Sequence, residues 1–229
     1  MFLDSTFLLL IPAMLFAFWA QWKVQSTYRR FSKVPAANGR SGREMALAIM
    51  NRNGITDVAV EEVGGTLSDH YDPRVKKVRL SSSNYSDHSI ASIAVAAHEV
   101  GHVLQHAEGY APLQFRSVLA PVAGFGSMLA FPLFMIGLFF NIPGVSKPLM
   151  DLGILFFTGA VVFQVITLPV EFDASKRALA QLTTTGAVMP EEVAQAKQVL
   201  DAAALTYVAA AAMAAIQLLR LVVLRNSRD

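Results

Sequence analysis

Four apolar runs dominate the pattern of hydrophobic and polar positions along the chain. Residues 7–22, 118–140 and 149–170 are apolar over lengths that span a bilayer as helices, if residues flanking the first run contribute to it. Residues 202–224 form a fourth run that is rich in alanine and therefore weaker on any transfer scale. The pattern predicts four membrane helices.

The first run could be a cleaved secretory signal instead of a membrane helix. No positive residue precedes it, and the aromatic residues near its end make a poor cleavage site. Trp19 and Trp22 are typical interface anchors and are followed by several basic residues. We therefore expect a retained anchor, followed by a polar connector over residues 25–38.

The polar region between the first two runs predicts a small α+β unit. Ser41 and Glu44 have the spacing of a capping box, which starts a short helix that ends at Asn53-Gly54. Three segments then have strand character, and the last two are expected to pair as a hairpin: residues 58–63, 66–71 and 76–81. Residues 89–108 follow as a helix that Gly109 ends, and Pro190 begins the last helix.

Charge indicates how the membrane runs are oriented. Residues 23–117 carry twelve Lys and Arg and residues 171–200 carry three more, so the positive-inside rule places both segments in the cytoplasm. Arg220, Arg225 and Arg228 disagree with this orientation if the fourth run crosses the membrane. The basic residues are scattered and border membrane runs, so nucleic-acid binding is a poor explanation for them.

The candidate chemistry lies in the helix at residues 89–108. His98 and His102 are four residues apart, which places both imidazoles on one helical face, suited to one metal ion. Glu99 between them is placed to accept a proton from a metal-bound water. This is the HExxH signature of zinc metalloproteases. Because the chain has no cysteine, His, Asp or Glu must hold any metal.

A catalytic zinc ion needs a third protein ligand and one open position. His106 would place three histidines along about 12 Å of straight helix, which is too long for one ion. Metzincins break the helix with a glycine at the position that Gln105 occupies here. Glu108 is too close in sequence, so Glu171 is the strong candidate, because two membrane runs return it to the same membrane face.

Asp173 is the alternative to Glu171 as the third ligand. A donor to the transition state is also expected near the metal, and four residues are chemically able to supply it. The sequence does not rank these four, which are His70, Tyr71, His106 and Arg177.

Three stretches together resemble the YugP-type bacterial membrane zinc metallopeptidases: residues 66–74, 89–106 and 168–177, with the four apolar runs in the same order. These proteases are relatives of the gluzincin membrane proteases typified by HtpX and the CAAX-processing proteases. The resemblance implies one Zn²⁺ per chain, held by ligands that match His98, His102 and Glu171, with Glu99 as the base. In those relatives the third-ligand helix reads Glu-x-x-x-Asp, and its Asp supports a ligand histidine. Ser175 stands at that position here, so the supporting role stays open.

The sequence thus predicts a mainly α membrane protein with a small α+β, zincin-like domain. The expected domains are an anchor (1–24), the zincin-like domain (25–117), a membrane hairpin (118–170), the third-ligand helix and cytoplasmic segment (171–200) and an Ala-rich membrane helix (201–229).

The expected activity is peptide-bond hydrolysis with a zinc-activated water, in a bacterial inner membrane with the active site facing the cytoplasm. The expected partners are the lipid bilayer and a polypeptide substrate. The expected substrates are membrane-associated or unfolded chains, which would add to the edge of the hairpin as a further strand. No nucleic-acid partner is expected, and the oligomeric state is unknown. The alternative function is an inactive membrane scaffold stabilised by the metal. A scaffold has no need for Glu99, which is placed as a base and not as a ligand.

Overall fold

The computed structural model describes residues 5–140, 142–184 and 188–227. The chain divides into two compact units. The helical unit consists of Met1–Ala20, Ala111–Pro169 and Thr206–Asp229, and the α/β unit consists of Gln21–Tyr110 and Val170–Leu205. Three of the long helices, α1, α6 and α7, contribute residues to both units.

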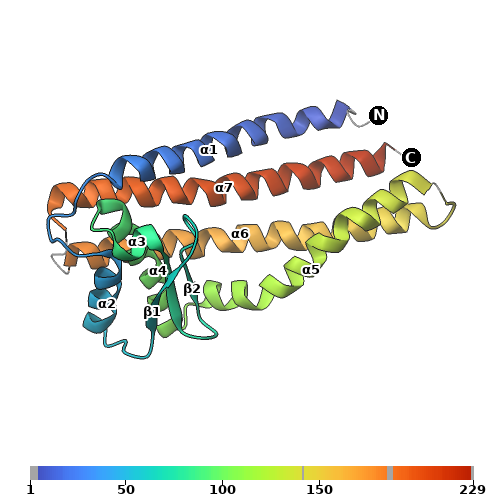
Figure 1. Cartoon of the computed structure of the whole chain (residues 1–229). Coiled ribbons are helices and arrows are strands. Elements are labelled where there is room, and N and C mark those ends of the chain that lie inside the picture. The colour runs from blue at the N-terminus through green and yellow to red at the C-terminus, as the bar shows by residue number, and fades with distance from the viewer. Residues whose placement is uncertain (1–4, 141, 185–187, 228–229) are drawn as a thin grey trace. The chain divides into compact units, whose positions relative to one another are not determined.

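Four long helices contain the four apolar runs. They are α1 (Leu10–Phe31, preceded by the 3-10 helix η1, Ser5–Leu9), α5 (Ala111–Phe140), α6 (Ser146–Thr184) and α7 (Pro190–Asn226), and Figure 1 labels them. Each is long and apolar enough to cross a membrane. This confirms the expected fold class, a mainly helical membrane protein with a small sheet.

The helices α1 and α7 both extend beyond their apolar runs. The connector expected over residues 25–38 is helical as far as Phe31, because α1 continues past the apolar run. The helix that begins at Pro190 and the fourth apolar run form one element, α7, and their junction has no glycine or proline that would break the helix.

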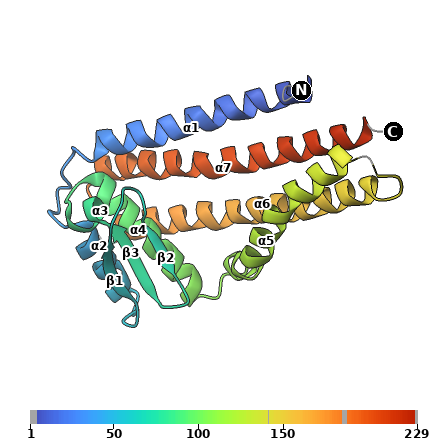
Figure 2. The same cartoon turned by 45° about the vertical axis from the view of Figure 1, so that its right-hand side comes forward.

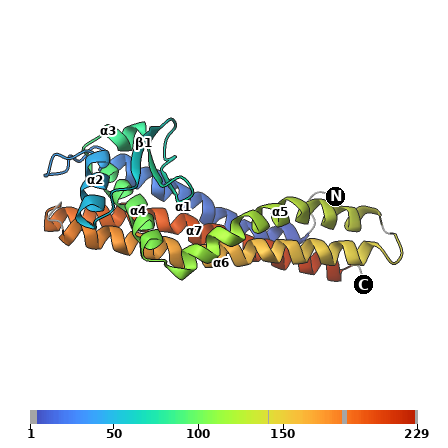
Figure 3. The same ribbon diagram turned by 90° about the horizontal axis from the view of Figure 1, so that it is seen from below.

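In the helical unit, α5 and α6 pack closely through glycines. A Cβ atom built on Gly137 of α5 would lie 2.5 Å from the carbonyl oxygen of Ser146, and one on Gly153 of α6 would lie 2.7 Å from that of Ala130. Because a side chain at either position would collide with backbone, these glycines set how near the two helices approach. Figure 1 and Figure 3 both show the two helices side by side.

The arginines that disagreed with the charge rule have partners in this unit. The Arg225 guanidinium forms an ion pair with Asp151 of α6, with Nε 2.8 Å from Oδ1. The Arg220 Nε donates to Thr6 Oγ1 at 3.2 Å, and the guanidinium lies over the ring of Phe7. Arg228 lies outside the described residues. These contacts offset part of the cost of placing the two described arginines at the end of an apolar helix.

In the α/β unit, the short helix α2 (Gly42–Arg52) begins with the predicted capping box. The Ser41 hydroxyl accepts from the backbone N–H of Glu44, and the Glu44 carboxylate accepts from the backbone N–H of Ser41. Gly42 allows the helix to approach the chain around Asn84, since a Cβ atom there would lie 2.1 Å from the Asn84 carbonyl oxygen.

A three-stranded sheet follows, in the order β1-β3-β2 (Figure 2). The strands are β1 (Ala59–Val63), β2 (His70–Asp72) and β3 (Lys77–Ser81). The antiparallel pairing of β2 with β3 confirms the predicted hairpin, while β1 pairs with β3 in parallel. The strand expected over residues 66–71 is wrong in its first part, because Leu67 has a φ of 54°, which extended backbone excludes.

The core of this unit is built around α4 (Ile90–Ala107), which follows the short helix α3 (Ser82–Ser86). The buried alanines and branched residues of α4 contact α2, the inner face of β3 and the last part of α6. The most central core side chains, all with no exposed surface, are Met45, Ile49, Val78, Leu80, Ile93, Val100, Ala178 and Leu182. The helix α4, which carries His98 and His102, is therefore packed against neighbouring elements on several sides.

Candidate metal centre

The α4 helix has well-defined ends. The Ser89 hydroxyl accepts from the backbone N–H of Ser92 at its start. At its end, Gly109 takes a left-handed conformation with a φ of 67°, and the backbone N–H of Tyr110 donates to the carbonyl of Gln105. The residues between are mostly small or branched apolar residues, with His98, Glu99 and His102 as the polar exceptions in the middle of the helix.

The continuation of α6 supplies the opposite side of the site. Its buried positions recur at helical spacing, namely Glu171, Ala174, Ala178 and Leu182, so one face of the helix packs against the core. Gly101 of α4 makes this contact possible, because a Cβ atom there would lie 2.4 Å from the Ala174 carbonyl oxygen. Glu171 lies less than one turn before this contact and is brought directly to the histidines.

His98, His102 and Glu171 come together, as the sequence predicted for these three residues. One ligand atom from each lies within 4.8 Å of the other two. The Nε2 atoms of His98 and His102 are 3.2 and 3.5 Å from the same carboxylate oxygen, Oε2 of Glu171. The two imidazole rings are nearly perpendicular, with centroids 4.8 Å apart.

This donor set fits a zinc ion. Bonds of 2.0–2.1 Å in tetrahedral geometry place neighbouring ligand atoms about 3.4 Å apart, which matches the two distances to Glu171. Two imidazole nitrogens and a carboxylate are also a known ligand set for catalytic zinc. The other ring nitrogens already have partners, since His98 Nδ1 is 3.1 Å from Ser175 Oγ and His102 Nδ1 is 3.0 Å from Gln105 Oε1.

Glu99 is buried beside the histidines and is not a member of the ligand cluster. Burial raises the pKa of its carboxyl group, and the nearby charges of His98 and His102 act in the opposite direction. A carboxylate with a raised pKa is a better proton acceptor than an exposed one. The chain has no other acidic residue so close in sequence to both histidines.

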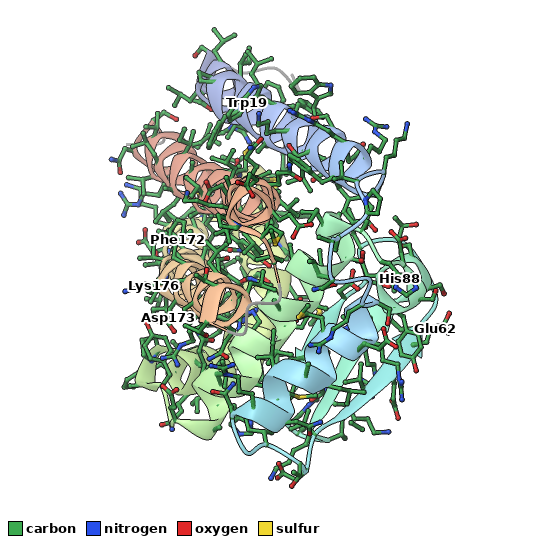
Figure 4. The ribbon with its side chains drawn as sticks, turned by 90° about the vertical axis from the view of Figure 1, so that its left-hand side faces the viewer. Trp19, Glu62, His88, Phe172, Asp173 and Lys176 are labelled. Carbon is green, nitrogen blue, oxygen red and sulfur yellow. The ribbon has the colours of Figure 1, made fainter. Side chains whose placement is uncertain are left out.

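Asp173, the alternative third ligand, points to a different partner. Its carboxylate accepts from Gln105 Nε2 at 2.8 Å and forms an ion pair with Arg177. Figure 4 labels Asp173 on α6, with Phe172 on another side of the same helix. Arg177 also donates to Glu108 at 2.6 Å, so Glu108 is likewise outside the ligand cluster.

The candidates for a transition-state donor are now distinguishable by their contacts. Arg177 is held by two carboxylates. His70 lies on the exposed side of β2 and contacts the Ser68 carbonyl and Arg79. Tyr71 points to the opposite side, where its hydroxyl is 2.7 Å from His106 Nδ1, and burial together with nearby carboxylates raises its pKa to about 12.

Tyr71 and His106 line a pocket of about 240 Å³ between β2 and the last turns of α4. Its walls include Val58 and Val103, and the ion pair of Asp57 and Lys76 lies at its edge. The volume suits a side chain more than a whole ligand, because small-molecule pockets begin at about 300 Å³.

The structure adds residues that the sequence did not single out. Gln105 is fully buried and contacts His102, and the carboxylate of Asp69 accepts from the backbone N–H of Ser81 and from Asn84. Asn84 in turn accepts from the hydroxyl of Tyr28 on α1 at 2.7 Å, so Asp69 connects the sheet to the anchor helix. Gln105 and Asp69 both lie in the stretches of family resemblance, and that resemblance was the only sequence signal for them.

Comparison with known proteins agrees with this geometry. Residues 6–226 match the model of a family described as "Putative neutral zinc metallopeptidase". The chain belongs to this family. It is also 48% identical over 222 residues to the "Putative membrane protease YugP" of Bacillus subtilis (strain 168), covering 96% of this chain and 97% of that protein. No solved structure matches the chain. The resemblance expected from the three motif stretches is thereby confirmed, and the chain is a zinc metallopeptidase homologue with four apolar helices.

Proposed function

We propose that this protein is a membrane zinc metalloendopeptidase of the gluzincin type, with one zinc ion held by His98, His102 and Glu171. The observation that carries the proposal is the convergence of two imidazole nitrogens from α4 on one carboxylate oxygen from α6, in a buried site beside Glu99. Family membership supports the metal and the reaction class. When bound, zinc supplies Lewis-acid chemistry, which acidifies a coordinated water and polarises the scissile carbonyl.

Glu99 is the general base in this proposal. It accepts the proton of the attacking water and passes it to the leaving amine, which requires a carboxylate whose pKa lies above that of an exposed glutamate. Its burial has this effect. His98 and His102 hold their positions through their Nδ1 contacts, so that both Nε2 atoms stay directed toward Glu171.

The substrate in this proposal is an extended polypeptide. The strand β2 is an edge strand, since β3 covers one side only, and an extended chain adds to such an edge through backbone hydrogen bonds. Tyr71 belongs to this strand and lines the pocket together with His106 of α4, and it is the preferred donor to the transition state because its hydroxyl faces α4. Membrane-associated or unfolded chains are the proposed substrates.

The membrane orientation is also part of the proposal. The α/β unit lies in the cytoplasm of a bacterial cell in this proposal and the helical unit in the plasma membrane, which the distribution of Lys and Arg supports. The chain has no cysteine, so single-cysteine variants carry one reactive thiol each. A membrane-impermeant maleimide should label Val145→Cys in intact cells and Arg40→Cys only after permeabilisation. The reverse result would place the site outside.

The decisive experiment measures zinc content and cleavage of unfolded casein by the purified full-length protein. Glu99→Gln should retain zinc and lose cleavage by about 10²–10⁴-fold, the usual contribution of general acid–base catalysis. The matched control, Glu62→Gln, changes an exposed glutamate on β1 and should leave both properties unchanged. Glu171→Ala should lose zinc. Cleavage that survives Glu99→Gln contradicts the mechanism.

The alternative function is a scaffold in which the metal only joins α4 to α6. A closed structural site requires a fourth protein ligand. Among the described residues the cluster has three members, and Asp173 and His106 contact other side chains. A wild-type protein that binds one zinc ion, is stabilised by it and cleaves no polypeptide would favour the scaffold.

A further inference from the structure

Gln105 is a fully buried amide whose orientation is determined by its neighbours. Its Nε2 lies 2.8 Å from the backbone carbonyl of Val170 and 2.8 Å from Oδ2 of Asp173. Both of these groups accept hydrogen bonds, since the Asp173 carboxylate is also paired with Arg177. An amide nitrogen is therefore the only end of the side chain that suits this position, and the reversed orientation would place three acceptors together.

This orientation determines which nitrogen of His102 carries hydrogen. The amide oxygen of Gln105 faces His102 Nδ1 at 3.0 Å and can only accept, so Nδ1 must be the N–H. The second ring nitrogen, Nε2, then carries the lone pair that can bind a metal ion, and it lies 3.5 Å from Glu171 Oε2. The buried Gln105 amide thus links the Val170 carbonyl of α6 to the ring of His102.

His98 is held differently. Its Nδ1 is 3.1 Å from the hydroxyl of Ser175, and a hydroxyl can either donate or accept. Ser175 therefore supports the ring position of His98 without dictating where its proton lies. The two histidines of the motif differ in this respect, although they occupy equivalent positions one turn apart on the same helix.

We propose that Gln105 is a positioning residue that keeps His102 in the Nδ1–H form and so keeps its Nε2 available for the metal. The proposal rests on the metal site of the proposed function but not on peptide hydrolysis. The Val170 carbonyl and the Asp173 carboxylate keep the amide in place, and Arg177 in turn holds Asp173, so both side chains support the same arrangement. In this way the acid that was the alternative ligand acts on the site through Gln105.

The first test is spectroscopic and needs neither metal nor substrate. Long-range ¹H–¹⁵N spectra of zinc-free, ¹⁵N-histidine-labelled protein report the tautomer of His102 at alkaline pH, where the ring is neutral. The wild-type protein should show Nδ1–H. Gln105→Met removes the acceptor with little change in length, so the proton should move to Nε2, where Glu171 accepts it. The same tautomer in both proteins overturns the proposal.

The second test measures zinc affinity by competition with a chelator. Gln105→Met should bind zinc about 10–100-fold more weakly, the usual effect of losing a group that orients a ligand histidine. Ser175→Ala should weaken binding less, and Gln198→Met, at an exposed position of α7, should have no effect. Unchanged zinc affinity in Gln105→Met also overturns the proposal.

A paired variant keeps the proposal testable if Gln105→Met does not fold. Gln105→Glu combined with Asp173→Asn exchanges the acid and the amide, so that an acceptor still faces His102 Nδ1 and a donor comes from position 173. In Gln105→Glu alone two carboxylates face each other, which should turn the side chain away from His102, so the pair should restore the Nδ1–H signal lost in the single variant and should bind zinc more tightly. Equal zinc affinity in the two variants contradicts the proposed role. A wild-type protein that binds no zinc would contradict the proposed function but leave the tautomer result standing.

Discussion

The two units of the molecule use apolar residues in opposite ways. In the α/β unit the large apolar side chains are buried against α4, whereas in the helical unit many are exposed, including Phe125, Phe139 and Phe140. An exposed apolar surface of this size would be unfavourable in water. The difference shows that the units are suited to different solvents, lipid for one and water for the other, although α1, α6 and α7 contribute to both.

Both units also bring helices together at glycines, but with different results. Gly137 and Gly153 bring α5 and α6 into contact along apolar surfaces. Gly101 brings α4 and α6 into contact where both helices carry polar side chains, and the three proposed ligands and Gln105 all lie within about one turn of that contact. The same kind of contact joins two apolar helices in one unit and brings a His-His-Glu cluster together in the other.

Gly101→Ala should give the largest effect. Its methyl group would overlap the Ala174 carbonyl, so α6 must move away from α4 and Glu171 must move from the histidines. Overpacking of this kind costs about 1–3 kcal/mol, and zinc binding should fall together with cleavage. Zinc titration of the purified variant measures this. Wild-type zinc affinity in Gly101→Ala would show that the contact does not position Glu171.

Gly137→Ala is the matching change in the helical unit. Its methyl group would overlap the Ser146 carbonyl, so the α5–α6 hairpin should lose about 1–3 kcal/mol of stability. Zinc affinity should stay near the wild-type value because the three proposed ligands all belong to the other unit. Thermal unfolding in detergent and zinc titration separate the two effects. A large loss of zinc affinity would show that the units are coupled.

Ser41→Ala should destabilise the α/β unit by about 1 kcal/mol, since it removes the capping box of α2. Because α2 packs on α4 away from the ligands, zinc affinity should change little. Urea unfolding followed with and without zinc checks the prediction. Stability that is unchanged in the zinc-free variant would contradict the assigned role of the cap.

Asp151→Asn should have the smallest effect. It removes the ion pair with Arg225, and a partly exposed pair contributes about 0–1 kcal/mol. The loss should be confined to the helical unit and should shrink at high salt, because salt screens exposed charges. Thermal unfolding at two salt concentrations measures it. A salt-independent loss would indicate that the pair is shielded from solvent.

The sequence alone determined the membrane helices, the ends of α2 and α4, and the candidate residues His98, Glu99 and His102. These features depend on periodicity, capping and spacing along one helix, all of which are local. It also indicated Glu171, by counting apolar runs and by family resemblance. The strand expected over residues 66–71 was wrong in part because the backbone of Leu67 is left-handed. A leucine side chain gives no indication of this conformation.

The contacts that hold the site together could be seen only in the tertiary structure. The contact of Gly101 with Ala174, the parallel pairing of β1 with β3 and the partners of Gln105, Asp173 and Ser175 join residues that are distant in sequence. Such contacts depend on which helix faces meet and how closely, and no local pattern encodes that. The sequence therefore named the candidate ligands, and the crossing of α4 and α6 determines which other residues contact them.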